Sequence, residues 1–410
     1  MKDRIILHCD CNSFFASVET VLHPEYKNVP MAVCGSVEDR RGIVLAKNEL
    51  AKKFNIQTAE TVFSAKKKCP HLVIAEPHHD LYLRFSQRVN DIYKRYTDMI
   101  EPFGIDESWL DVTGSTKLFG DGLEIAKKIS DDVKREIGIT ISVGVSFNKV
   151  FAKLGSDYKK PDAITVINRD NFKEIVYPLP VSSLLFVGKK TEMQLLTMGI
   201  RTIGELSESS ADILEERLGK NGLLLSKYAK GEDDSPVSPS SPEDTKSVSN
   251  GITFRHNLTS CEEYKIGIDY LSEEIGTRLR EKGLKCSTVQ LTIKDEYLRT
   301  IQRQAPRIPP SDIGGEISET AFAILKKEWK SGAPIRMLTV GATNLFRSDE
   351  VSFQLSIFDS DMDSNRDKRK NSEKTVDKIR QKYGNGAIIK GAVLDTDIGI
   401  YTAPDKKKQK

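Results

Sequence analysis

The apolar positions of the first 166 residues repeat at two different spacings. Alternation at every second residue predicts strands, whereas repeats at three and four residues predict the apolar face of a helix. Apart from an interruption at about 24–77, the two spacings follow one another in a βαββαβ-like order, which is typical of a ferredoxin-like sheet. The expected elements are a strand at 4–10, a helix from Phe14 to Leu22, strands at 99–105 and 109–113, a helix at 122–137 and strands at 139–146 and 163–167.

The pattern changes twice farther along the chain. Residues 167–231 contain helical repeats punctuated by turns, so we expect this region to be wholly helical. The segment 232–250 then holds prolines and serines with almost no aliphatic residues, which is the composition of a linker. The sequence therefore predicts an α+β multidomain protein. The expected later elements are strands at 247–254, 287–294, 298–304 and 336–344 and helices at 262–282, 316–330 and 371–383.

Composition sets broad limits on what this protein is. Its 410 residues are too many for one ordinary core, and 38% hydrophobic with 30% charged residues describes a soluble globular protein. The net charge is only +3, so any nucleic-acid surface must be a local basic stripe. Six cysteines without a CxxC pair are expected to be reduced and buried, which argues against zinc. With no signal-peptide pattern and no membrane-spanning stretch, we expect a cytoplasmic protein.

Acidic residues stand at the ends of two predicted strands. Asp10 closes the first strand, and Asp106 and Glu107 lie between the runs 99–105 and 109–113, where a hairpin would bend. If these strands pair, the three carboxylates converge, and they would repel each other unless divalent cations lay between them. Carboxylate oxygens are the hard ligands that Mg²⁺ prefers. The alternative is that these acids end strands only for solubility.

Three segments decide between these alternatives. They resemble the Y-family translesion DNA polymerases, in particular the DinB-like polymerase IV and UmuC-like branches, and they are Asp10–Glu19, Gly104–Asp111 and Ser142–Pro161. The likeness extends over about residues 1–346. The resemblance implies a right-hand polymerase with a ferredoxin-like palm, small fingers, a helical thumb and an α+β little-finger domain. The implied domains are the palm at 1–23 and 78–166, the fingers at 24–77, the thumb at 167–231, a linker at 232–246, the little finger at 247–346 and a C-terminal extension at 347–410.

The resemblance also implies a two-metal reaction. Asp10, Asp106 and Glu107 are the expected catalytic ligands of two Mg²⁺ ions, or of Mn²⁺ as a substitute, with the backbone carbonyl of Cys11 as a further ligand. One ion activates the primer 3′-hydroxyl and the other binds the triphosphate. Asp111 lies outside this set and is expected to be a surface or capping carboxylate.

Aromatic and basic residues are expected to bind the nucleotide. Phe14 and Phe15 are both expected at the nucleotide site, where one ring can face the core and the other the sugar. Phe15 aligns with the steric gate that excludes a ribose 2′-hydroxyl. A helix core position is the alternative for Phe15. Lys160 aligns with a lysine that contacts the triphosphate. The nearby Lys149, Lys153 and Lys159 are expected to be solvated.

The fingers depart from the pattern of the family. Where relatives carry a tyrosine and an arginine that bind the triphosphate, this chain has Glu49 and Lys52, and Ala46 replaces a hydroxyl residue. Lysine offers a point charge, whereas arginine offers a forked contact. Ile43 and Leu45 fill the roof over the nascent base pair. We therefore expect weak triphosphate affinity and a narrow range of lesions.

DNA and a sliding clamp are the expected macromolecular partners. A thumb turn with Gly188 and Lys190 is an expected phosphate contact, or else a structural turn without DNA contact. On the little finger, one strand face and a following arginine-containing segment suit backbone binding, although a solvated sheet face is the alternative. The strand residues are Thr288, Gln290, Thr292 and Lys294, and the arginines are Arg299, Arg303 and Arg307. The peptide QLSIF resembles the bacterial clamp-binding motif through Gln354, Leu355, Ile357 and Phe358.

Together these features predict a monomeric, low-fidelity, DNA-directed DNA polymerase. It would add dNMPs from dNTPs to a primer terminus on primer-template DNA, in translesion synthesis and repair of DNA damage. Two other classes remain open. A non-catalytic DNA-binding relative is suggested by Ala46, Glu49 and Lys190 but is disfavoured by the intact acidic set. A nucleotide cyclase with a similar palm would need neither the thumb nor the little finger.

Overall fold

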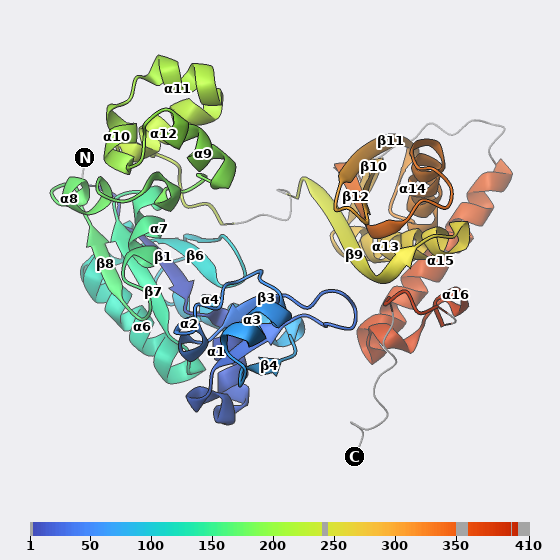
Figure 1. Cartoon of the computed structure of the whole chain (residues 1–410), viewed down its shortest axis with the longest axis horizontal. Helices are drawn as coiled ribbons and strands as arrows, with labels where there is room; N and C mark the ends of the chain where they lie inside the picture. Colours follow the sequence, from blue (N-terminus) through green and yellow to red (C-terminus); the bar gives the residue numbers. More distant parts are fainter. Residues whose placement is uncertain (1–2, 240–244, 350–359, 395, 401–410) are drawn as a thin grey trace. The chain divides into compact units, whose positions relative to one another are not determined.

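The computed structural model describes residues 3–239, 245–349, 360–394 and 396–400. They form two compact units, one made of Met1–Gly35 and Ile43–Ser240, the other of Ser36–Gly42 and Ser241–Lys410. Mixed helices and sheets build both units, as predicted for an α+β multidomain protein (Figure 1). Each unit has its own hydrophobic core and is described separately.

A five-stranded sheet in the order β5-β6-β1-β7-β8 forms the centre of the first unit (Figure 1). All neighbouring strands are antiparallel except β7 and β8, which are parallel. The first four have the ferredoxin-like arrangement that was predicted, and β8 extends it at one edge. The strands are β1 (Ile6–Cys11), β5 (Ile100–Pro102), β6 (Glu107–Asp111), β7 (Ile141–Ser146) and β8 (Ile164–Ile167).

Strand alternation gives this sheet two different faces. Leu7, Cys9 and Cys11 point into a large apolar core with helices α1, α4 and α6, while the intervening His8 and Asp10 point to the opposite face, which helix α7 covers. Five helices pack around the sheet. They are α1 (Phe14–Leu22), α4 (His79–Tyr93), α5 (Thr116–Phe119), α6 (Gly122–Ile137) and α7 (Lys149–Tyr158).

Glycine lets α7 approach the sheet closely. A Cβ atom on Gly144 of β7 would lie 1.8 Å from the carbonyl oxygen of Ala152 and 2.5 Å from the amide nitrogen of Ser156, which no side chain permits. Gly155 faces Gly144 from the helix, and its Cβ would lie 3.0 Å from the Gly144 Cα. This contact holds the side chains of α7 directly over the strand that carries Asp10.

A small sheet and a helical bundle complete the first unit. The sheet has the order β3-β2-β4, and the region from residue 168 to 230 contains helices and no strand, as predicted. The sheet elements are β2 (Met31–Cys34), β3 (Val44–Lys47) and β4 (Val73–Ala75), with α2 (Glu49–Lys52) and α3 (Val62–Lys68). The bundle contains α8 (Phe172–Val176), α9 (Lys189–Thr197), α10 (Ile203–Glu208), α11 (Ala211–Leu218) and α12 (Lys220–Ala229).

The first half of the predicted linker is part of the first unit instead. Val237 is only 1% exposed and packs in a cluster with Trp109 of β6. The Asp233 carboxylate accepts a hydrogen bond of 3.2 Å from the Lys149 amide, and the Ser238 amide donates to Glu101 at 2.9 Å. A few well-placed contacts are thus enough to hold a segment whose composition lacks aliphatic residues.

The second unit is an antiparallel sheet covered on one face by two helices. The strand order is β11-β10-β12-β9, and the apolar side chains of alternate positions pack under the helices. The elements match the predicted order, with strands that are longer than predicted. They are β9 (Ser247–Leu258), α13 (Cys261–Glu281), β10 (Leu284–Asp295), β11 (Thr300–Ser311), α14 (Gly314–Glu328) and β12 (Ile335–Arg347).

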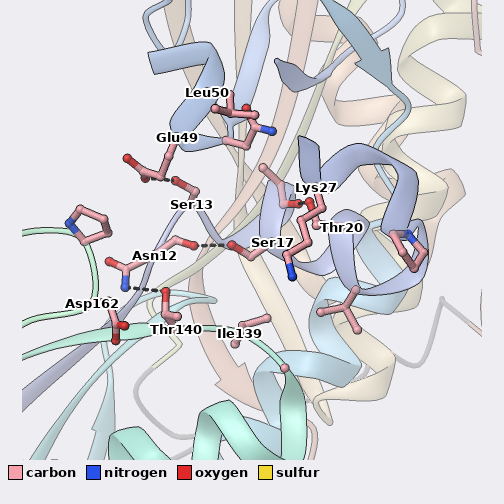
Figure 2. A pocket seen from close by; sticks show the side chains of 16 residues that line it. Asn12, Ser13, Ser17, Thr20, Lys27, Glu49, Leu50, Ile139, Thr140 and Asp162 are labelled. Carbon is pink, nitrogen blue, oxygen red and sulfur yellow. Dashed lines mark hydrogen bonds between the residues drawn. The ribbon is translucent and has the colours of Figure 1, made fainter. Parts of the chain in front are cut away.

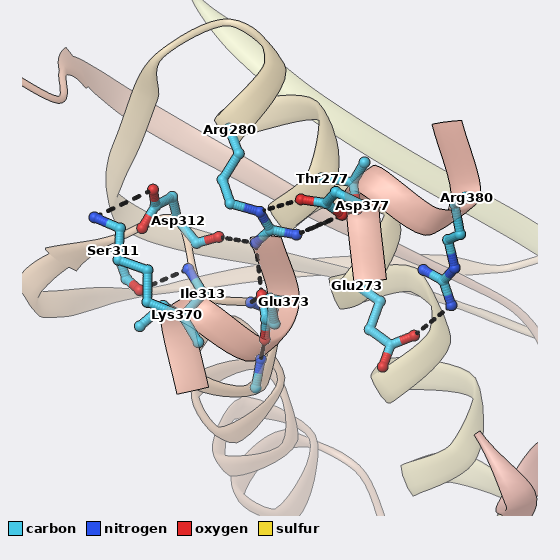
Figure 3. Close-up of polar contacts among 12 residues, drawn as sticks. Glu273, Thr277, Arg280, Ser311, Asp312, Ile313, Lys370, Glu373, Asp377 and Arg380 are labelled. Atoms are coloured by element: carbon cyan, nitrogen blue, oxygen red, sulfur yellow. Dashed lines mark hydrogen bonds and ion pairs between the residues drawn. The ribbon is translucent and has the colours of Figure 1, made fainter. Parts of the chain in front are cut away.

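The C-terminal extension docks on the helices of this unit through charged groups. Arg280 of α13, which is 9% exposed, donates to Asp377 at 2.6 Å and to Glu373 at 2.5 Å (Figure 3). Glu373 also accepts from the amide of Gly314, so its carboxylate caps the first turn of α14. The helix that carries these acids, α15 (Ser360–Tyr383), begins earlier than predicted and is followed by α16 (Gly391–Leu394).

Two remaining expectations concern cysteines and membranes. Five of the six free cysteines are buried as predicted, but Cys261, the first residue of α13, is exposed. None of the helices in the described part of the chain combines the length and the apolar character that a membrane crossing requires.

Candidate active site

The three acidic residues that were predicted to converge line one pocket. Asp10 of β1 pairs directly with Glu107 of β6, and the Cys11 amide donates a hydrogen bond of 2.9 Å to the carbonyl oxygen of Asp106 in the β5–β6 bend. Adjacent antiparallel strands project paired residues to the same face. The register therefore places the carboxylates of residues far apart in the sequence side by side.

The pocket has a volume of about 450 Å³ and gathers most of the residues predicted for catalysis and nucleotide binding. Ile43 does not line this pocket: it pairs with Thr61 and is 40% exposed. Of the residues singled out from the sequence, those that line the pocket are Asp10, Cys11, Phe14, Phe15, Leu45, Lys52, Asp106, Glu107 and Lys160.

Burial and mutual repulsion shift the titration of these carboxyl groups. Burial raises the pKa of Asp10, and the nearby Lys160 ammonium offsets only part of this. Burial together with the charges of Asp10 and Glu107 raises the pKa of Asp106 to about 6. Burial opposes ionisation of Glu107 too, but the neighbouring His8 and Lys153 lower its pKa to about 2. Burial and repulsion among these neighbouring carboxylates therefore oppose ionisation of Asp106.

Two lysines bind the carboxylates. The Lys160 ammonium lies 2.7 Å from Asp10 Oδ2 and 2.7 Å from Asp157 Oδ1. Lys153 of α7 contacts Glu107, so its expected position in solvent was wrong. Lys149 is likewise not solvated, because its ammonium lies 2.6 Å from Glu101 Oε1 and 4.5 Å from the Trp109 ring centre. The lysine ammonium groups already compensate part of the negative charge of the carboxylates. The carboxylate oxygens are hard donors, which fit divalent metal ions.

His8 is a residue of this site that the sequence did not reveal. It is fully buried between β1 and α7, with Nδ1 2.8 Å from Ser156 Oγ and Nε2 3.4 Å from Glu107 Oε2. Among the described residues Nε2 has no closer partner, and its nitrogen groups with the Asp10 and Glu107 oxygens within 4.8 Å. Burial lowers the pKa of His8, and the neighbouring Glu107 opposes this shift. A polar residue two positions before Asp10, on the same strand face, is the signal that could have identified it.

We expect His8 to orient Glu107 for cation binding. Glutamine places an amide where Nε2 stands, whereas asparagine reaches only the Nδ1 position. His8→Asn should therefore weaken Mn²⁺ binding about tenfold, and His8→Gln should retain most of it. Electron paramagnetic resonance titration of Mn²⁺ measures the difference. Equal binding by wild type and both variants would assign His8 to packing alone.

The two adjacent phenylalanines both line the pocket but differ in burial. Phe14 is 3% exposed and belongs to the core. Phe15 is half-buried, lines the pocket and stacks on Tyr82 of α4, with ring centres 4.2 Å apart at an angle of 14°. The Tyr82 hydroxyl donates to the buried carboxylate of Glu19 at 2.6 Å. Tyr82 and Glu19, which the sequence analysis missed, therefore fix the ring that the resemblance assigns to the sugar.

Glu49 turns away from the catalytic pocket. Its carboxylate accepts from Lys52 at 2.5 Å and from the Ser13 hydroxyl at 3.3 Å, and it lines a neighbouring pocket of about 560 Å³ instead (Figure 2). Lys52, in contrast, lines the catalytic pocket. The ion pair therefore relieves the repulsion expected between Glu49 and a triphosphate, but it also engages the only charge that Lys52 can offer.

The predicted DNA-binding residues lie elsewhere in the fold. Gly188 and Lys190 are exposed at the start of α9, and space is open around Gly188. On β10, the half-exposed Gln290, Thr292 and Lys294 share the sheet face opposite the helices. The predicted position of Thr288 on this exposed face was wrong, because its side chain is buried and its hydroxyl accepts a hydrogen bond of 2.9 Å from Asn344.

The structure places two of the predicted arginines on the helix side of the second sheet and does not describe the clamp peptide. Arg303 and Arg307 point to the helix side, where they bind Glu328 and Glu316 of α14, because Arg303 pairs with the core-facing Leu291. Their expected place on the DNA-facing side was therefore wrong. Gln354, Leu355, Ile357 and Phe358 lie outside the described residues.

Comparisons with known proteins agree with this geometry. Residues 9–157 match the impB/mucB/samB family, and residues 245–357 match the C-terminal domain of the same family. A DNA polymerase IV of Acetivibrio thermocellus is 48% identical, with 95% of this chain and 98% of that protein covered. DNA polymerase IV 1 of Bacillus subtilis is 36% identical over 96% and 94% of the two chains. A solved Y-family DNA polymerase chimera has a TM-score of 0.74 at 25% identity, covering 83% of this chain and 99% of its own.

Proposed function

This chain belongs to the impB/mucB/samB family of Y-family DNA polymerases, and from that premise we propose that its acidic pocket extends a DNA primer with two Mg²⁺ ions. The enzyme is a DinB-like, template-directed DNA polymerase of low fidelity that acts in translesion synthesis. The convergence of Asp10, Asp106 and Glu107 beside Phe15 and Lys160 is the observation that carries the metal and site assignment.

Each pocket residue has a distinct role in this proposal. Asp10, Asp106, Glu107 and the Cys11 carbonyl hold the cations, which when bound would acidify the primer 3′-hydroxyl and neutralise the triphosphate. Lys160 exchanges its contact with Asp10 for one with the triphosphate. His8 and Lys153 keep Glu107 in place. Catalysis then depends mostly on positioning and electrostatics, as in other phosphoryl transfers.

We assign the remaining regions to DNA binding. The sheet β5-β6-β1-β7-β8 is the palm, β3-β2-β4 the fingers, residues 167–231 with α8 to α12 the thumb and residues 247–346 the little finger. Gly188, Lys190 and the face with Gln290, Thr292 and Lys294 contact DNA phosphates without reading bases. Such contacts make affinity fall steeply with salt.

We further propose that QLSIF (Gln354 to Phe358) binds the bacterial sliding clamp. Its pattern would place Leu355 and the Ile357–Phe358 pair in apolar pockets, with Gln354 at the rim. A peptide spanning Phe353 to Asp359 should bind the clamp in solution, and its failure to do so would remove this assignment.

Primer extension tests the proposed function directly. With Mg²⁺ or Mn²⁺, wild type should extend primers opposite undamaged and damaged templates, with clamp raising the yield. Asp106→Ala should bind the same DNA without extending it. Absence of extension by both proteins would favour the non-catalytic, DNA-binding alternative.

The Glu49–Lys52 ion pair predicts a change in substrate affinity. Glu49→Gln should lower the KM for dNTP about fivefold, because Lys52 is then free to bind the triphosphate. Steady-state kinetics of single-nucleotide insertion measures this. Glu208→Gln, at an exposed position on α10, is the matched charge change and should leave KM unaltered. An equal effect of both substitutions would show that net charge alone is responsible.

A further inference from the structure

A large aromatic side chain is left in solvent on the small sheet subdomain. Phe63, the second residue of α3, is 71% exposed, whereas Val62 and Ala65 form the buried face of the same short helix. The helix therefore does not need Phe63 for packing. A phenyl ring held rigidly outside the core is available to bind something else.

The backbone connects Phe63 to the catalytic pocket. Thr58 lines that pocket, and the chain then runs antiparallel beside β3: Ala59 donates to the Val44 carbonyl at 2.8 Å and Val44 donates to the Glu60 carbonyl at 2.9 Å. Thr61 pairs with Ile43, which was predicted in the roof but does not line the pocket, and the Thr61 hydroxyl caps α3. Phe63 thus follows closely on the pocket-lining Thr58, at the end of the segment that pairs with β3.

Positive charge surrounds the ring. Lys66, Lys67 and Lys68 form the last turn of α3, and the Lys67 ammonium lies 4.6 Å from the Phe63 ring centre. Lys68 is paired with Glu60 at 2.6 Å, but neither Lys66 nor Lys67 forms an ion pair within the described parts of the chain. An exposed aromatic ring next to unpaired cations is the combination that binds single-stranded nucleic acid, since bases stack while ammonium groups contact phosphates.

We propose that Phe63 is a stacking platform for unpaired template bases ahead of the templating position, with Lys66 and Lys67 contacting their phosphates. The proposal rests on the polymerase function, which supplies such a strand beside the roof. A protein partner would bury a wider apolar area, whereas here the ring is followed by exposed lysines. The platform would hold the oncoming template extended and keep its next base out of the active site.

Binding to templates of different overhang tests this role. Wild type should bind a primer-template with about eight unpaired template nucleotides more tightly than one with a single unpaired nucleotide. Phe63→Ala should reduce this difference in affinity about tenfold, by weakening binding to the longer overhang. Phe63→Trp should retain it. Leu118→Ala is the matched control, because Leu118 is 81% exposed on α5, past the end of β6 that is remote from Glu107. Fluorescence anisotropy measures the dissociation constants.

Two further readouts separate stacking from a general loss of binding. 2-Aminopurine at the first unpaired template position should be quenched by wild type and not by Phe63→Ala, and Lys67→Gln should lower the salt slope of affinity by about one. Phe63→Ala should still extend primers at saturating DNA, which shows that the polymerase function stands independently. An unchanged overhang gain, or an equal loss with the short template, would overturn the proposal.

Discussion

Replacing Asp106 with asparagine is expected to reduce nucleotide insertion by about 10³-fold or more, because the proposed cation ligand, worth several kcal/mol to the transition state, would be lost. Single-turnover insertion with Mg²⁺ measures the change. DNA binding should persist, since Asp106 lies in the β5–β6 bend and is not among the residues proposed to contact DNA. A variant that inserts nucleotides within tenfold of wild type would remove Asp106 from the catalytic set.

The same substitution should stabilise the fold when divalent ions are absent. The pKa of Asp106 is raised to about 6 in the folded protein, so folding favours the protonated carboxyl. Ionisation of Asp106 does not lower the free energy of unfolding below about pH 4, where the carboxyl is protonated. The destabilisation grows as the pH rises toward 6 and is complete above that pH. Asparagine removes this penalty, and we expect the free energy of unfolding to increase by about 2 kcal/mol at pH 7.5.

Urea denaturation in a chelating buffer provides the measurement. The difference between Asp106→Asn and wild type should be largest at neutral pH and should vanish near pH 4. Asp111→Asn serves as a control, because the Asp111 carboxylate accepts hydrogen bonds from Thr113 in its own turn and does not line the pocket. If Asp106→Asn had a lower free energy of unfolding than wild type at neutral pH, the prediction would be wrong. The charged Asp106 carboxylate would then be stabilised by groups other than those that surround it in the pocket.

Phe15→Ala is expected to admit ribonucleotides. With the ring present, a 2′-hydroxyl would overlap a side chain that Tyr82 holds in place, and forcing extra atoms into a packed site costs about 1–3 kcal/mol. Discrimination between dNTP and rNTP should therefore fall by about 10²-fold. The ratio of kcat/KM for the two substrates measures the effect.

Phe14→Ala gives the matched comparison. Phe14 is in the core, so its truncation should lower the unfolding temperature while sugar discrimination stays near the wild-type value. Tyr82→Leu, which removes the stacked ring beneath Phe15, should give an intermediate loss of discrimination. If Phe15→Ala still rejected ribonucleotides, the gate would have to be another residue.

Local patterns in the chain were enough to predict much of this fold. The period-two alternation of β1, β6 and β7 and the helical repeat of α6 identified the ferredoxin-like core, because each element buries one face and must repeat at its own geometric period. The same alternation located Asp10 and Asp106–Glu107 at strand ends. Their convergence depended on the pairing of β1 with β6, which the tertiary structure supplies.

Composition misled where a few specific contacts override it. Residues 232–238 have the composition of a linker, yet Val237 is buried and Asp233 binds the first turn of α7. Arg303 was expected to face DNA, but the register of β11 turns it toward α14. Register is a property of two paired strands. The sequence of one strand alone therefore does not specify the sheet face on which a residue of an edge strand lies.

What the sequence by itself determined is the order of elements, the acidic residues at strand ends and the phenylalanine pair, since these depend only on spacing along one segment. Tertiary structure alone decided which side chains surround them. His8 and Lys153 join Glu107 only because Gly144 and Gly155 let α7 lie directly on the sheet, and Tyr82 supports Phe15 only because α4 packs against α1. Such contacts depend on the distance between elements, and no pattern within a single element contains that distance.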